Sequence, residues 1–411
     1  MPNLRFIPDF VIKINGQAIS RSMRASVSSV HYQDGIEGAD RVELALVNDN
    51  LRWFKEPSLK TNNSLSLSMG YVDDMQDMFS GEITGIDATF PGSGVPSLTV
   101  VAHDPLNKMM HGNIQINWPS MPDPAIVATI AGKYGLVPDA DSGGLLAALI
   151  SIVEFILDGH ERRQTVSDFE FLSQIAHEYG LDMYIDPFRP NTLLFSGLEL
   201  SSQQPVRKLV WGQDGSLIDF TPRLSTVGQV FGVGIRIYIQ EIGTELVLAV
   251  GVDIGSGNLG VSIMPIVQTV SGLVTNFIDQ AAPDAAPIVD FLSNFTQSII
   301  GQQLQQHGLD AGDSGSWIML DDAADPAAAV KMVMAELTRR LNQRLTGSGS
   351  TVGDPHLRAG TDIEIEGLGE KSQINEFNGK YRVTSASHTI DSGGYRTSFE
   401  ARKVYDLGGL L

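Results

Sequence analysis

The sequence contains no cysteine. Its absence excludes disulfide bonds, thiolate metal sites and catalysis by a cysteine nucleophile. It does not identify the redox compartment, because a chain without cysteine suits any location.

Basic residues are scarce as well. The chain has 28 Lys and Arg against 48 Asp and Glu, a formal net charge of −20. A charge of this sign repels nucleic-acid phosphates and anionic lipids. The balance therefore argues against sequence-specific binding to nucleic acid.

Long apolar runs are also missing. The longest, from Leu145 to Leu157, contains Glu154 and is shorter than the roughly 20 residues that a membrane-spanning helix needs. The first residues lack the apolar core of a signal peptide. We expect cytoplasmic synthesis and no stable membrane insertion, so a place outside the cell would require assembly into a particle or non-classical export.

Apolar residues and glycine are abundant. Hydrophobic residues make up 42% of the 411 residues and charged residues 18%, and glycine occurs 42 times. Such a chain can bury enough apolar surface to fold, which excludes a disordered protein. At roughly 100–200 residues per domain it should hold two to four domains, and its composition indicates extensive β-structure.

Alternation of apolar and polar residues predicts antiparallel strands in the first hundred residues. Asn15-Gly16 is a favoured hairpin dipeptide, and Leu65, Leu67 and Met69 fall on one face of a strand. The expected strands are Phe10–Ile14, Val27–Gln33, Arg41–Val47, Ser64–Met69, Phe79–Thr89 and Ser97–Ala102. Their spacing is typical of an antiparallel barrel or sandwich.

Helical signals follow these strands. Asp123 is a good N-cap residue before Pro124, and Gly135 ends that helix. Residues 144–158 are expected to form a second, mostly apolar helix.

A third helix is specified more fully. Ser167-Asp-Phe-Glu170 is a capping box at its start, and Gly180 closes it. Its expected buried side chains include Phe171, Leu172 and Ile175. A hairpin should follow, with strands at 181–186 and 192–196.

The rest of the chain is expected to be β, then irregular and helical, then β again. Asp325-Pro326 begins a clear helix, and Gly347–Ser350 reads as a flexible link. The expected β segments are Val206–Val250, Asp362–Ile365, Gly379–Ser385 and Tyr395–Lys403.

The sequence patterns give no metal site. His177-Glu178 lacks the second histidine of a zinc helix. Asp139-Ala-Asp141 begins like a calcium loop, but Ile150 stands where a bidentate Glu is required. Both are interpreted as ordinary helix and turn residues.

They give no catalytic or cofactor site either. Gly367–Ser372 has the wrong spacing for a phosphate loop, and no Gly-x-Ser-x-Gly motif occurs. The pairs Asp73-Asp74 and Asp321-Asp322 are adjacent in sequence, as in solvated turns. We therefore predict no catalytic, cofactor-binding or metal-binding residues, and a role that is not enzymatic.

Several segments, taken in order, resemble the phage late control protein D family, the hub proteins of contractile tails and injection systems. The helix motif also resembles the hub part of type VI secretion spike proteins. The segments are Phe79–Pro91, Ser97–Leu106, Gln164–Tyr184 with its Gln-x-x-Ser-Asp-x-x-Phe-Leu helix, Val210-Trp-Gly212, Phe220–Val230, Leu357-Arg-Ala-Gly360, Phe377–Val383, His388 and Gly393–Glu400. The family's basic loop after Asp-x-Leu is reduced here to Lys108 and His111.

The resemblance implies a homotrimer in which two barrels per chain form a pseudo-sixfold ring. This ring would adapt a hexameric inner tube, or a tube-initiator protein, to a separate trimeric spike, next to other baseplate subunits. The acidity would then line a channel that does not retain cargo or DNA, or would keep the outer surface soluble.

The expected fold class is mainly β, with two antiparallel barrel-like hub domains, an α/β insert and a helical insertion. The first hub domain is placed at 1–105 and the α/β insert at 106–205, with helix 167–179 and hairpin 181–196. The second hub domain is placed at 206–250 and 350–411. The irregular helical insertion takes residues 251–349, with helix 326–345.

Alternatives remain at this point. A tail-associated cell-wall hydrolase would need an acidic pair in a cleft. An outer-membrane barrel conflicts with the missing export signal and the capped helices. The sequence leaves open an infectious phage or a toxin-delivery particle, and the insertions at 142–158 and 254–322, which depart from the common phage form, favour the latter.

Overall fold

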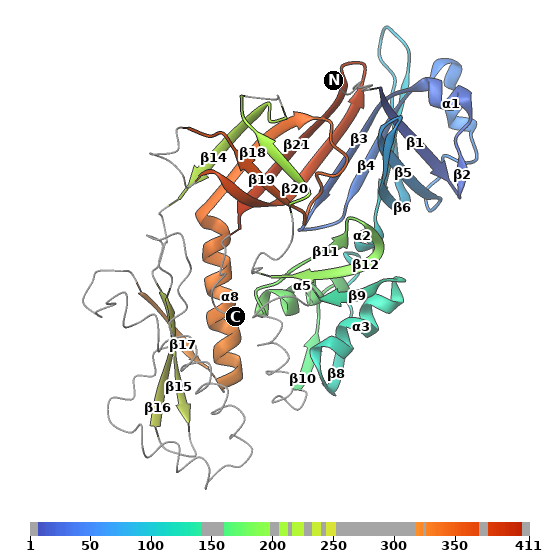
Figure 1. Ribbon diagram of the computed structural model, residues 1–411. Coiled ribbons are helices and arrows are strands. Elements are labelled where there is room, and N and C mark those ends of the chain that lie inside the picture. The colour runs from blue at the N-terminus through green and yellow to red at the C-terminus, as the bar shows by residue number, and fades with distance from the viewer. Residues whose placement is uncertain are drawn as a thin grey trace.

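A long antiparallel sheet forms the upper layer of the molecule, and an α/β insert lies beneath its N-terminal half (Figure 1). The computed structural model describes residues 7–140, 160–197, 205–212, 216–225, 232–239, 244–251, 317–323, 326–369 and 377–404. The protein is mostly β, as the sequence predicts.

The N-terminal half of the sheet comes from the first hundred residues, and every strand predicted there is present. Its elements are β1 (Pro8–Ile14), β2 (Gln17–Ala18), α1 (Arg21–Ser26), β3 (Val27–Gly35), β4 (Arg41–Val47), the 3-10 segment η1 (Asp49–Lys55), β5 (Ser64–Tyr71), β6 (Asp74–Thr89) and β7 (Ser97–His103). Leu65, Leu67 and Met69 are buried, as their alternation predicts. Asn15 and Gly16 both have positive φ, as the tight turn between β1 and β2 requires.

The C-terminal half surrounds a second core, which includes Ile363, Tyr381 and Phe399. Its strands are β13 (Arg207–Val210), β14 (Asp219–Leu224), β18 (Leu345–Val352), β19 (Asp362–Glu366), β20 (Gly379–Asp391) and β21 (Gly394–Lys403). The strands predicted at 362–365, 379–385 and 395–403 are confirmed. The flexible link predicted at Gly347–Ser350 is wrong, because these residues lie within β18 and pair with β14 and β21.

The two halves are continuous. Strand β3 pairs antiparallel with β20, from Gly35 opposite Ser385 to Val30 opposite Ile390. This pairing gives one 13-stranded sheet with the main order β14-β18-β21-β20-β3-β4-β7-β6-β5-β1-β2. The expected barrel-like halves therefore share a hydrogen-bonded seam.

The α/β insert, defined as the elements from α2 to β12, packs around its own core, which contains Trp118, Ile130 and Phe171. Its elements are α2 (Pro105–Met109), β8 (Ile116–Met121), α3 (Asp123–Lys133), β9 (Val137–Ala140), β10 (His160–Gln164), α5 (Asp168–Glu178), β11 (Asp182–Asp186) and β12 (Arg189–Ser196). Strand β10 pairs with β8, and β12 lies between β11 and β9.

The capped helix of the insert is confirmed. Ser167 Oγ accepts a hydrogen bond from the backbone N–H of Glu170 at 3.2 Å. Phe171, Leu172 and Ile175 are buried, and the hairpin β11–β12 follows as predicted.

The predicted cap at Asp123 is wrong by one residue. Pro122 is the N-cap residue of α3, and no side chain caps the helix. Asp123 instead lies in the first turn, where its carboxylate binds Arg162 Nη2 at 2.7 Å and accepts from Tyr179 Oη at 2.9 Å. Long-range partners outcompete the local backbone for this side chain.

Part of the segment expected in the second hub domain lies elsewhere. Strands β15 (Gly232–Ile239) and β16 (Thr244–Gly251) pair with each other, and β15 also pairs with β17 (Trp317–Ala323), in a separate three-stranded sheet. The described parts of 206–250 do form strands as predicted, but periodicity does not encode which strand a given strand pairs with.

Helix α8 (Pro326–Arg344) runs from this small sheet to β18 (Figure 1). It matches the helix predicted from Asp325-Pro326. The helix expected at 144–158 and most of the insertion 254–322 lie outside the described residues. Among the described helices, none combines the length and apolar character that a membrane span requires.

A truncation in the core of the insert tests this packing. The ring of Phe171 is 4% exposed and stacks near Trp118, with centroids 6.5 Å apart. We expect Phe171→Ala to lower the free energy of unfolding by about 3–5 kcal/mol, because the cavity loses apolar contacts. Phe188→Ala, at a ring 57% exposed, is the control and should change it by less than about 0.5 kcal/mol. Equal urea midpoints for the two variants would show that α5 is packed differently.

Candidate functional site

A buried arginine lies where three parts of the chain meet. Arg358, in the loop between β18 and β19, is 3% exposed. Its Nε donates to Asp34 Oδ2 in β3 at 2.6 Å, and its Nη2 donates to Tyr32 Oη at 2.6 Å and to the Met78 carbonyl in β6 at 2.8 Å. Its Nη1 donates to the Pro187 carbonyl in the β11–β12 turn at 3.2 Å. One guanidinium thus connects both halves of the sheet and the insert.

The loop carrying Arg358 is held in a close approach to the insert. Gly360 has a φ of +81°, and a Cβ at this position would lie 2.3 Å from a ring carbon of Tyr184 in β11. Glycine is therefore required here on two counts, backbone conformation and space. This explains why Arg358 and Gly360 occur together in the Leu357–Gly360 motif.

Two neighbouring carboxyl groups, Asp40 beside Tyr32 and Asp104, have raised pKa values. Burial raises the pKa of Asp104 to about 7. Burial, with the nearby charges of Asp104 and Asp34, raises the pKa of Asp40 well above its usual range. Asp40 Oδ2 accepts from Tyr32 Oη at 2.9 Å. Asp104 Oδ1 caps α2 by accepting from the N–H of Leu106 at 2.9 Å, whereas its buried Oδ2 has no hydrogen-bond partner among the described residues.

A neutral histidine completes the junction. His388 in β20 is fully buried and stacks on Tyr32, with ring centroids 5.9 Å apart. Its Nε2 donates to the Leu357 carbonyl at 3.1 Å, and Nδ1 accepts from Tyr395 Oη at 3.0 Å. Burial, assisted by the charge of Arg358, lowers the pKa of His388 to about 3. The ring therefore serves as a fixed donor and acceptor at neutral pH.

Two further arginines hold the hairpin of the insert. Arg382 in β20 donates to Asp362 Oδ1 at 2.9 Å and to Ser196 Oγ in β12 at 2.7 Å. Arg402 in β21 forms an ion pair with Asp182 in β11. We name Arg358, Arg382 and Arg402 the arginine clamp. All three come from the C-terminal part of the chain, and each forms a hydrogen bond or an ion pair with the β11–β12 hairpin.

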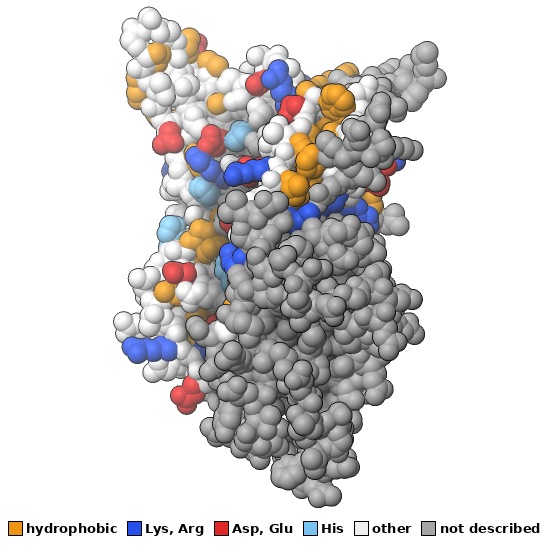
Figure 2. Space-filling view, turned by 90° about the vertical axis from the view of Figure 1, so that its left-hand side faces the viewer, with side chains coloured by type: hydrophobic (Ala, Val, Ile, Leu, Met, Phe, Trp, Pro, Cys, Tyr) orange, Lys and Arg blue, Asp and Glu red, His pale blue; other side chains and the backbone are white. Residues whose placement is uncertain are grey.

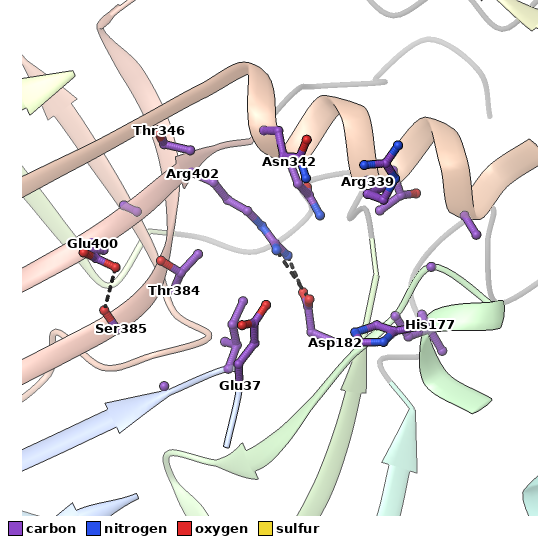
Figure 3. Close-up of a pocket in the computed structure, with 18 of the residues that line it drawn as sticks. Glu37, His177, Asp182, Arg339, Asn342, Thr346, Thr384, Ser385, Glu400 and Arg402 are labelled. Atoms are coloured by element: carbon purple, nitrogen blue, oxygen red, sulfur yellow. Dashed lines mark hydrogen bonds and ion pairs between the residues drawn. The ribbon is translucent and has the colours of Figure 1, made fainter. Parts of the chain in front are cut away.

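A cleft borders this clamp between the sheet, the end of α5 and helix α8. It has a volume of about 1510 Å³. Figure 3 shows Arg402 and Asp182 facing each other in it, with Ser385 and Glu400 on the sheet side. Its described wall mixes acidic and basic side chains, and His177 is the one histidine among the lining residues.

This arrangement does not resemble an acid–base site. The Ser385 hydroxyl donates to Glu400 at 3.4 Å, with no histidine in that contact. Of the carboxyl groups that the structure describes, Asp40 and Asp104 have raised pKa values; Asp104 is buried, and Asp40 is half-buried and bound to Tyr32. Across the described ranges, no three His, Asp or Glu side chains are grouped to hold a metal ion.

The short motifs that the sequence analysis interprets as helix and turn residues lie on the surface or in turns. His177 and Glu178 are exposed at the end of α5, and Glu178 pairs with Arg162. Asp139 pairs with Arg189 on the surface. Asp73 lies in the turn before β6, and Asp74 begins β6 and contacts His356 at 3.2 Å. Gly367 and Gly369 form a turn after β19, with positive φ at both.

Sequence reasoning missed the role of the clamp. Arg358 and Arg382 belong to the motifs that carry the family resemblance. Asp34 and Asp40 lie in none of these motifs. A charged residue amid apolar strand residues, as in Tyr381-Arg382-Val383, is the local signal for a buried pair.

The junction predicts the effect of removing its central charge. We expect Arg358→Met to lower the free energy of unfolding by about 3–5 kcal/mol, because Asp34 and two carbonyls lose a buried donor. Arg189→Met is the control: its side chain is 55% exposed, and loss of its surface ion pairs should cost less than about 1 kcal/mol. A cost for Arg358→Met as small as that of the control would contradict the assigned role.

Asp104 predicts a pH dependence. Its folded pKa of about 7 exceeds the model-peptide value of 3.8, so the folded state holds a proton that the unfolded state releases. The resulting stabilisation is present below about pH 4 and is lost as pH rises towards 7. Asp104→Asn should therefore gain stability relative to wild type over this range, measured as melting temperature against pH. For Asp73→Asn, at an exposed turn, the curve of melting temperature against pH should run parallel to that of wild type. A parallel curve for Asp104→Asn as well would show that Asp104 is ionised in the folded state.

No protein-family model and no curated protein matches this sequence. Solved structures do. A 43 kDa tail protein of prophage MuSo2 from Shewanella oneidensis aligns with a TM-score of 0.61 and 11% identity over 97% of this chain and 99% of its own. A tail protein from Neisseria meningitidis MC58 aligns with a TM-score of 0.59 and 11% identity over 97% and 98%.

A type VI secretion component from E. coli aligns at a TM-score of 0.49, with 10% identity over 95% of this chain and 76% of its own. At such identities, likeness is evidence of fold. The resemblance predicted from the motifs is confirmed at that level, and this chain has the fold of phage tail proteins.

Proposed function

We propose that the chain is a structural baseplate hub of a contractile phage tail or a phage-tail-like injection particle. The observation that carries this proposal is the fold, shared over nearly the whole chain with two phage tail proteins. The order of the late control protein D motifs supports it, because motif residues such as Arg358, Gly360 and His388 build the buried junction.

The proposed hub is a homotrimer. Each chain supplies two halves of one sheet, so three chains supply six, the number needed to match a hexameric inner tube or tube-initiator protein. The threefold symmetry matches a separate trimeric spike, and other baseplate subunits complete the surroundings. We propose residues 1–105 as the first hub domain and 106–205 as the insert. The proposed second hub domain takes 206–225 with 345–411, because β18 pairs with β21 from Thr346 onward.

The sheet has ends available for subunit contacts. Strands β2 and β14 lie at the ends of the main strand order. Figure 2, which views the β14 side, shows hydrophobic side chains gathered in the upper half of this face. The exposed hydrophobic residues of β14 and β18 are Leu224 at 38% and Val352 at 49%, and Ile218 before β14 is 55% exposed. Such edges are usually paired or covered in an assembly.

The role proposed is mechanical rather than enzymatic. The mixed-charge cleft offers no nucleophile with a histidine base among its described residues. The net charge of −20 suits a component that does not retain nucleic acid. This holds whether the acidic residues line the channel of the proposed ring or lie only on its outer surface. The place of action is the assembled particle, after synthesis in the cytoplasm.

Electron microscopy of the purified particle tests the proposal. We expect three copies of the chain between spike and tube, because two sheet halves per chain must meet six tube subunits. Six copies, or a position in the sheath, would contradict it. A cleared zone in a cell-wall zymogram of the purified protein would favour the hydrolase instead.

A further inference from the structure

Four exposed apolar side chains gather on two adjacent loops of the N-terminal half. We name Leu51, Phe54, Phe90 and Val95 the apolar tip; their exposures are 41%, 43%, 64% and 52%. The rings of Phe54 and Phe90 stack with centroids 5.7 Å apart and planes 8° apart. The N–H of Asn48 donates to the Pro96 carbonyl at 2.8 Å, which joins the two loops at their base.

The buried side chain of Trp53 anchors the apolar tip to the core of the N-terminal half. Trp53, between the exposed Arg52 and Phe54, is 3% exposed and belongs to the core of the N-terminal half. Its indole Nε1 donates to the Val47 carbonyl at 3.1 Å, and its N–H donates to Asn48 Oδ1 at 2.8 Å. The exposed rings are therefore presented by an anchored segment.

The backbone of the tip is strained. Asn50 and Leu51 have φ values of 54° and 55°, in the left-handed region that side chains with a Cβ rarely adopt. Core packing does not explain this conformation for Leu51, because its side chain is exposed. Strain kept at an exposed apolar residue is typical of a binding segment.

The charge beside the tip is opposite to that of the whole chain. Residues 48–60 carry Arg52, Lys55 and Lys60 against Asp49 and Glu56, within a protein of net charge −20. Arg52, Lys55 and Lys60 are exposed, as is Asp49, whereas Glu56 is half-buried, so the exposed charges of this segment are mainly basic. Arg52 donates to Ser22 Oγ of α1 at 3.1 Å, and its guanidinium lies 4.6 Å from the centre of the Trp53 ring. A basic rim around aromatic residues fits an acidic rim around an apolar pocket.

We propose that the apolar tip docks into a different protein of the same particle, whose contacting face is apolar at its centre and acidic at its rim. The proposal rests on the hub function above. An anionic membrane fits less well, because the chain as a whole repels it and the local cations fall short of a polybasic cluster. In a symmetric contact between copies of this chain, the basic side chains of one tip would meet those of the other and not an acidic rim, which argues against such a contact.

Site-specific photo-cross-linking in the assembled particle tests this. p-Benzoylphenylalanine replaces Phe54 in the full chain, and particles are purified before irradiation. We expect one major product between this chain and a different particle protein, identified by mass spectrometry. The same reagent at Phe188, a still more exposed ring on the insert, should not give that product.

Two sets of variants then separate apolar from charge contributions. In the chain that carries the cross-linker at position 54, Phe90→Ser should lower the yield by about tenfold or more, as for a central residue of an interface. The pair Arg52→Glu with Lys55→Glu should also lower it by about tenfold, because the reversed rim would repel an acidic partner. Phe188→Ser should leave it unchanged. All these side chains are exposed, so melting temperatures should stay at the wild-type value.

Other outcomes overturn the inference. A product between two copies of this chain would assign the tip to self-contact, and binding of the purified chain to phosphatidylserine vesicles that Phe54→Ser abolishes would assign it to a membrane. Particles that contain the chain but give no product would show that the tip is unoccupied. Particles without the chain would instead refute the hub function.

Discussion

Arg358 places a positive charge in the interior at the point where both halves of the sheet and the α/β insert meet. A buried guanidinium is costly unless its donors find partners, so its surroundings are constrained to supply them. Here they come from β3, β6 and the β11–β12 turn, segments far apart in sequence. The charge therefore defines one arrangement of these parts.

Two more arginines of the C-terminal half bind the insert through polar contacts. Arg382 and Arg402 reach Ser196 and Asp182 from strands of the C-terminal half. Gly360 lies against Tyr184, which also packs with Ile36 and Ala359 in a small apolar cluster, so polar and apolar contacts hold the hairpin together. Polar contacts of this kind select the position and orientation of the insert relative to the sheet.

The local features of the fold were predictable from sequence, because their causes are local. Alternation gave the strands of the N-terminal half, and Ser167 with Glu170 marked the start of α5. The β3–β20 seam, the β8–β10 pair and the separate sheet of β15 were not predictable, because pairing over long separations leaves no periodic signal. Asp123 failed as a cap for the same reason, since distant Arg162 and Tyr179 bind it. The motifs contained Arg358, but its partners Asp34 and Tyr32 lie outside them.

The central claim is that the junction at Arg358 makes the two sheet halves and the insert one unit. Native-state hydrogen exchange on wild type and Arg358→Met tests it most directly. The account predicts that amides in β3, β11–β12 and β19–β20 lose protection together in the variant. Loss confined to residues 353–361, with the other strands as protected as in wild type, would contradict it.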